Sequence, residues 1–252
     1  MPSRFAALAF AVLAAPAAAV AEFPVPEILL WESASTPRAH AATPAFSLPA
    51  DSGAPPVAHL VWLDPSGISE GTAATAKPEV VNLMRGLGVK VIWRRGDPHE
   101  LARPGELRVI LLNRPGTRDK GTSVLGATPA QTDGEPHVWV HVPSVAQALG
   151  IERLDGEATL DPRSAHSLGI GLARVIAHEV VHAIAPELPH GKGLMSARLD
   201  RRMLTASTIP VDPEVGLALR AALSTARRAA AAATAPTGAL LAAEATTDRE
   251  EP

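Results

Sequence analysis

The sequence predicts a domain of the α/β or α+β class, with a mixed, mostly parallel sheet. Two observations predict it over residues 57–228. Short aliphatic and β-branched runs alternate with a segment of helical periodicity, and two long helical patterns follow them. The expected order is strand, helix, four strands and two helices. The chain has 252 residues, of which 46% are hydrophobic, and this length is enough for one sizeable core.

The expected strands share β-branched and aliphatic residues, and turn residues separate several of them. We expect strands at 59–63, 89–93, 107–112, 122–127 and 138–142. The 107–112 segment is almost wholly apolar, which predicts burial on both faces. The 122–127 segment is weaker and is expected at an edge of the sheet.

The expected helices have recognisable start and stop signals. They are predicted at 78–87, 163–184 and 213–228. The first begins at a proline and is followed by a glycine. Asp161 is the expected N-cap of the second, with Pro162 in its first turn. Pro186 ends it, because the residue before a proline disfavours the α conformation. Asp212 is the expected N-cap of the third.

Residues 1–21 have the features of a signal peptide. Arg4 precedes an apolar run at 5–20, and Ala19-Val20-Ala21 satisfies the small-x-small rule for cleavage after Ala21. An uncleaved membrane anchor is the alternative, but the run is short and contains Pro16. No later stretch is expected to span a bilayer. We therefore expect an exported protein, periplasmic or extracellular, of the kind found in a bacterial envelope.

Two further segments flank the expected domain. Residues 22–56 form a Pro- and Ala-rich linker or arm, and residues 229–252 form an Ala-rich tail that we expect to be disordered. The sequence leaves open whether the arm is an inhibitory propeptide. The absence of cysteine excludes a cysteine switch, whereas steric blocking or ligation by His40 stays open.

Composition excludes several classes of function. The net charge is −3, from 23 Lys and Arg against 26 Asp and Glu, so no basic surface for nucleic acid is expected. The chain has no cysteine, which excludes disulfides, thiol catalysis and zinc held by thiolates. It has no tyrosine and only 3% aromatic residues, so a stacking platform for single strands is not expected. The oligomeric state is not predicted.

The pattern that points to chemistry is His178-Glu179-Val180-Val181-His182, inside the expected 163–184 helix. Two histidines four residues apart lie on one face of a helix, so both can ligate one metal ion. Glu179 can reach a water at the metal without being a ligand, as in zinc hydrolases. The pattern arises by chance about 0.02 times in such a chain. The alternative is a buried helix whose histidines are satisfied by hydrogen bonds.

A catalytic zinc site takes three protein ligands and leaves one position for water. His190 is the expected third ligand, because the segment 185–189 (Ala-Pro-Glu-Leu-Pro) breaks the helix and lets the chain turn back. Glu187, Asp200 and the upstream histidines are the other candidates.

With Gly193-Leu194-Met195 following His190, the motif resembles the metzincin zinc peptidases, and most of all their matrixin-type members. In that family a glycine ends the helix, a third histidine follows, and a methionine turn passes beneath the metal. The expected order of strands and helices is also similar. The family spacing H-E-x-x-H-x-x-G-x-x-H would place glycine at Ala185 and the ligand at Leu188. Here the histidine comes two residues later, and the tyrosine of some metzincins is missing.

The resemblance implies a zinc-dependent endopeptidase acting on peptide or protein substrates. His178, His182 and His190 would bind Zn²⁺, and Glu179 would be the general base. By the same resemblance, the 122–127 edge strand would bind an extended peptide by strand addition. One alternative is a catalytically inactive zincin-like domain, marked by a fourth ligand such as Glu187 or Asp200. The other is an envelope interaction protein without metal.

Overall fold

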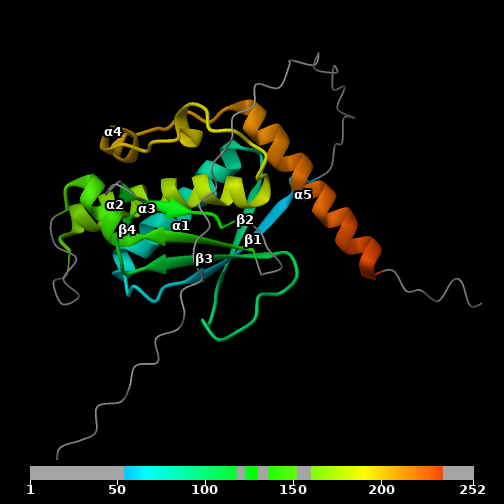
Figure 1. Cartoon of the computed structure of the whole chain (residues 1–252), viewed down its shortest axis with the longest axis horizontal. Coiled ribbons are helices and arrows are strands. Elements are labelled where there is room, and N and C mark those ends of the chain that lie inside the picture. Colours follow the sequence, from blue (N-terminus) through cyan, green and yellow to red (C-terminus); the bar gives the residue numbers. More distant parts are fainter. Residues whose placement is uncertain (1–53, 118–122, 130–135, 152–159, 235–252) are drawn as a thin grey trace, which may run out of the picture. The chain divides into compact units, whose positions relative to one another are not determined.

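The structure is a computed structural model that describes residues 54–117, 123–129, 136–151 and 160–234 (Figure 1). These residues all belong to one structural unit, 52–252. The expected signal peptide at 1–21, most of the arm at 22–56, and the end of the tail from residue 235 lie outside the described residues.

The main sheet has five strands in the order β2-β1-β3-β7-β6. Its members are β1 (Val57–Leu63), β2 (Lys90–Arg95), β3 (Glu106–Leu112), β6 (Gly126–Ala127) and β7 (His137–His141). The pairs β1–β2, β1–β3 and β3–β7 are parallel, and β6 is antiparallel to β7. The predicted mixed, mostly parallel sheet is therefore confirmed, and the weak 122–127 segment supplies its edge strand. Two short strands, β4 (Gly116–Thr117) and β5 (Ser123–Val124), form a separate antiparallel pair.

Within the described ranges, five α-helices and one short 3-10 helix accompany the sheet (Figure 1). They are α1 (Glu70–Gly86), α2 (Val142–Leu149), α3 (Pro162–Ile184), η2 (Gly193–Met195), α4 (Arg201–Thr205) and α5 (Pro213–Thr234).

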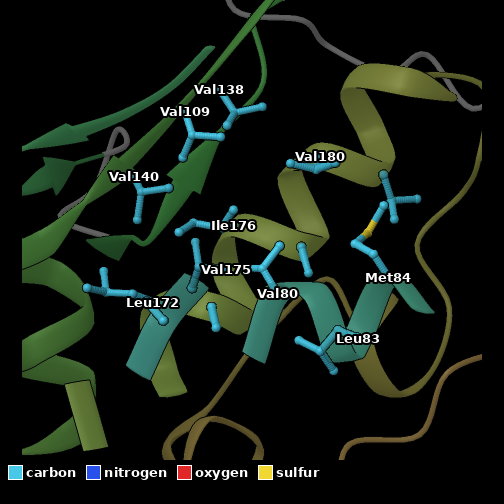
Figure 2. Close-up of a cluster of buried hydrophobic side chains, with 14 of the residues drawn as sticks. Val80, Leu83, Met84, Val109, Val138, Val140, Leu172, Val175, Ile176 and Val180 are labelled. Carbon is cyan, nitrogen blue, oxygen red and sulfur yellow. The ribbon is translucent and has the colours of Figure 1, made fainter. Parts of the chain in front are cut away.

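The core lies between the sheet and the helices α1 and α3. Figure 2 shows valines of β3 and β7 facing apolar side chains of both helices. Its labelled members are Val80, Leu83, Met84, Val109, Val138, Val140, Leu172, Val175, Ile176 and Val180. Each fully buried aliphatic side chain of this kind contributes about 1.5–3 kcal/mol to folding.

Strand β3 is half-buried, which corrects the predicted burial on both faces. Leu107, Val109 and Leu111 are buried, whereas Ile110 and Leu112 on the other face are only partly buried. The helices α1 and α3 thus cover one face of this strand, and the other face, which also carries Glu106 and Arg108, is less buried overall.

Helix α1 starts at Glu70, eight residues before the predicted start. Ser69 caps it by accepting a hydrogen bond from the backbone N–H of Thr72 at 3.2 Å. Pro78 lies inside the helix, where its ring removes one backbone donor. The buried face, which includes Thr72, Ala76 and Val80 at intervals of four, offsets that loss by packing on α3.

Two other helices differ from the prediction. Residues 142–149 form α2 directly after β7, although the sequence pattern predicted only the preceding strand there. Helix α5 continues to Thr234, so the first residues of the expected disordered tail are helical. Alanine has the highest helix propensity, which explains the extension.

Helix α3 spans the predicted segment and is the central helix of the unit. Asp161 accepts hydrogen bonds from the backbone N–H groups of Arg163 and Ser164, at 2.9 and 3.1 Å. Of the helices in the described ranges, α3 alone has the length and apolar composition to cross a membrane, and 78% of its apolar window is buried inside the unit. Such burial is usual for the central helix of a domain core.

An ion pair joins β2 and β3 at the start of β3. The guanidinium of Arg94 donates to both carboxylate oxygens of Glu106, at 3.0 and 2.8 Å, and the backbone N–H of Arg103 donates to Glu106 at 3.0 Å. Arg94 also pairs with the more exposed Glu100 at 2.7 Å. Bonding to Arg94 lowers the pKa of Glu106 from 4.5 to about 2.

We predict that this pair contributes to stability in acid. The pKa of Glu106 is depressed in the folded state, so its contribution is complete above pH 4.5 and is lost as the pH falls toward 2. In urea unfolding at a series of pH values, the unfolding free energy of Glu106→Gln should decrease less than that of wild type as the pH falls from 4.5 toward 2. Glu100→Gln is the control and should have a smaller effect, because exposed ion pairs contribute little. Equal pH curves for wild type and Glu106→Gln would contradict the assignment.

Candidate metal centre

The structure brings together the three predicted histidines. His178 and His182 lie one turn apart on α3, and His190 lies on the loop that follows. Their ring centroids are 4.7–5.3 Å apart. One nitrogen from each ring lies within 4.8 Å of the other two. The other candidates for third ligand, Glu187 and Asp200, do not belong to this cluster.

The chain returns to α3 because the helix stops abruptly. Its last residue is Ile184, and Ala185 has a non-helical conformation at the C-cap. The backbone N–H of Leu188 donates to the carbonyl of Ala185 at 3.1 Å, closing a turn, and Leu188 packs against the core. The ligand position of the metzincin spacing is thus taken by a partly buried leucine, and the longer loop brings His190 to the cluster.

The ring of His178 is oriented by the segment that follows His190. Its Nδ1 lies 2.8 Å from the carbonyl oxygen of Leu194. A carbonyl only accepts, so Nδ1 carries the proton and Nε2 keeps its lone pair. This is the tautomer that a metal-ligating histidine adopts when a second partner holds its other nitrogen.

The turn that supplies this carbonyl is η2, the segment expected as a methionine turn. The backbone N–H of Leu194 donates to the carbonyl of Pro210 at 2.9 Å, and that of Gly191 donates to Met195 at 2.7 Å. Gly193 has φ +60°, and a Cβ there would collide with the carbonyl of Pro210. Leu194 and Met195 are buried, so the turn is part of the core beneath His178.

The polar atoms of the cluster fit a bound metal ion. Among the described residues, His182 Nε2 is one of two buried side-chain nitrogens without a hydrogen-bond partner. An orphaned buried acceptor is costly unless something binds it. Three nitrogens bound to one zinc at ~2.1 Å are ~3.4 Å apart, so small rotations of the rings would bring the three nitrogens to that spacing.

Burial keeps the rings of His178 and His182 in the form that binds metal. Desolvation, together with the neighbouring His178 and His190, lowers the pKa of His182 to about 4. Desolvation also lowers the pKa of His178. Neutral imidazole is the ligand form, so burial favours the metal-binding form of these two rings near neutral pH. Exposure increases from buried His178 through His182 to exposed His190, so the cluster opens to solvent at His190.

Glu179 is also buried, and it faces the edge of the sheet. Its Oε2 accepts a hydrogen bond from the hydroxyl of Thr128 at 2.9 Å. A Cβ on Gly126 would lie 2.8 Å from Glu179 Cγ and 2.7 Å from a methyl of Val175. Glycine therefore allows β6 to approach α3 closely enough for Thr128 to reach the carboxylate.

The sequence analysis did not identify Thr128 or Leu194 as partners of the site. A glycine within a short strand signals a close approach, so Gly126 was the one available clue. Leu194 lies in the segment expected as a methionine turn, but nothing there marks its carbonyl as the partner of His178, and nothing in the pattern marks Thr128.

Comparison with known proteins adds no relative: no protein-family model, no curated protein and no solved structure matches this chain. The structure itself shows a mixed α/β fold with three clustered histidines that could hold a metal ion.

We predict that all three histidines are needed for metal binding. His178→Ala, His182→Ala or His190→Ala should each weaken zinc affinity by more than about 100-fold, because each removes a direct ligand. Competition with a chromophoric chelator measures this. His166→Ala is the matched control, since His166 is exposed on the same helix. Unchanged affinity in His190→Ala, with a loss in Glu187→Gln or Asp200→Asn, would assign the third ligand elsewhere.

We predict that Gly193→Ala disturbs the site through η2. The added Cβ meets the backbone of Pro210 in a left-handed conformation, which costs about 1–3 kcal/mol. The displaced Leu194 carbonyl should weaken metal affinity by about 10–100-fold. Gly191→Ala is the control, because nothing lies within 4 Å of a Cβ at that position. Thermal unfolding and chelator competition should separate the two variants, and equal behaviour would contradict this role of η2.

Proposed function

We propose that this protein is an exported zinc-dependent peptidase of metzincin-like type. The observation that carries the proposal is that two imidazoles of α3 and one of the following loop converge. A buried glutamate follows the first of these histidines on the same helix. His178, His182 and His190 bind the metal, and Glu179 is the adjacent general base.

The donor set favours zinc. Three neutral imidazoles without thiolates or carboxylates form the ligand set of a catalytic zinc centre. No fourth His, Asp or Glu joins the cluster within the described ranges, whereas a structural zinc site is normally closed by a fourth protein ligand. This difference argues for a hydrolase over an inactive zincin-like domain. When bound, zinc lowers the pKa of a water toward neutrality and polarises a carbonyl.

Glu179 supplies the proton chemistry. It follows a ligand directly on the helix and does not belong to the histidine cluster. In the proposed reaction it accepts the proton of the attacking water and passes it to the leaving amine. A structural metal site would have no use for this carboxylate, whose burial is costly.

The position of the edge strand supports a peptide as substrate. Strand β6 is the last strand of the sheet and lies against α3, next to Glu179. An extended peptide that pairs with the outer side of an edge strand gains main-chain hydrogen bonds. Such a peptide would lie alongside the base.

We predict that Glu179→Gln abolishes cleavage and keeps the metal. The amide cannot accept the proton, so the rate should fall by about 10²–10⁴-fold, whereas the histidine cluster is unchanged. The assay incubates the zinc-loaded mature protein with a diverse peptide library and identifies the cuts by mass spectrometry.

The outcomes separate the alternatives. Cuts made by wild type and lost in Glu179→Gln support the peptidase. Retention of zinc without any cut would indicate a binding domain. Failure to bind zinc would contradict the metal centre itself.

A further inference from the structure

The side chain of Thr128 joins the edge of the sheet to the glutamate of α3. Thr128 follows β6 directly, and its hydroxyl is 2.9 Å from Glu179 Oε2 and 3.0 Å from the backbone carbonyl oxygen of Glu179. The contact is partly buried and connects residues 51 positions apart in the chain. One threonine thus reaches both the side chain and the backbone of the same glutamate.

We propose that Thr128 is a positioning residue, whose hydroxyl holds the carboxylate of Glu179 in one orientation at the edge strand β6. A hydroxyl has one proton, and a carboxylate is a stronger acceptor than a backbone carbonyl. The proton therefore goes mainly to Oε2. A glutamate side chain has three rotatable bonds, and anchoring one oxygen removes most of that freedom.

The anchoring matters because a general base acts only within hydrogen-bond reach of the proton that it takes. Because the carboxylate is planar, holding Oε2 at Thr128 also limits where Oε1 can lie. Oε1 lies on the β6 side as well, 3.0 Å from the position that a Cβ on Gly126 would occupy. The strand that would bind the peptide therefore also orients the base. This consequence rests on the proposed peptidase function.

A double-mutant cycle tests the contact without any assay of activity. In the metal-free protein, Thr128→Val should lower the melting temperature by a few degrees. Its effect should be at least halved in the Glu179→Ala background, because the side-chain acceptor is then missing. Equal effects in both backgrounds would mean that the hydroxyl serves only the backbone carbonyl, and would overturn the proposal.

Kinetics of the zinc-loaded protein test the consequence. Thr128→Val should lower kcat by at least about tenfold with KM within about twofold, since the substrate surface is retained. Thr128→Ser keeps the hydroxyl and should restore kcat to within about threefold of wild type. Zinc affinity should be unchanged in both variants.

Thr205→Val is the matched control. It removes an exposed threonine hydroxyl of α4 that donates to the carbonyl of Arg201 at 2.9 Å, and kcat should not change. Equal kcat in Thr128→Val and wild type would overturn the positioning role. If wild type cleaves no peptide, the proposed function fails, and the thermal cycle still decides whether Thr128 holds Glu179.

Discussion

The burial of α3 against one face of the sheet and against α1 is the constraint on which the site depends. Apolar contacts along almost the whole helix give it one position, and His178 and Glu179 are carried into the core with it. Their polar atoms lose water there and need partners. The carbonyl of Leu194 and the hydroxyl of Thr128 provide them, so the same packing that folds the domain also orients the imidazole and the carboxylate.

The segment after α3 is held by the same helix, which explains how an exposed loop can place a ligand. Arg174 is buried one turn before His178, and its guanidinium donates to the carbonyls of Met203 and Ala206 around the end of α4. Desolvation lowers its pKa, and the two carbonyl bonds offset part of the cost of burying the charge. Because η2 is also hydrogen-bonded to Pro210, the segment that carries His190 is held at η2 as well as at the end of α4.

Elements with local signals were predicted well. The boundaries of α3 follow from the Asp161 cap and from the proline after its end, and β1, β2, β3 and β7 begin and end within two residues of their expected segments. The expected 122–127 strand is divided between β5 and β6. The predicted start of α1 was wrong because the sequence pattern does not distinguish a proline in the first turn of a helix from a proline inside a well-packed helix. Helix α2 was missed because its first residue, Val142, continues the alternation of Val138 and Val140 in β7, although Pro143 in its first turn is a helix-start signal.

The candidate site was likewise predicted where local signals act, and not where distant elements meet. The period of the helix places His178 and His182 on one face whatever the rest of the chain does, and the broken segment at 185–189 indicates a return toward His190. The hydrogen bonds to Leu194 and Thr128 join residues 16 and 51 positions apart. No periodicity or turn rule acts over such separations. These contacts arise where packed elements meet, because burial leaves each polar atom with only the partners that the neighbouring elements bring within reach.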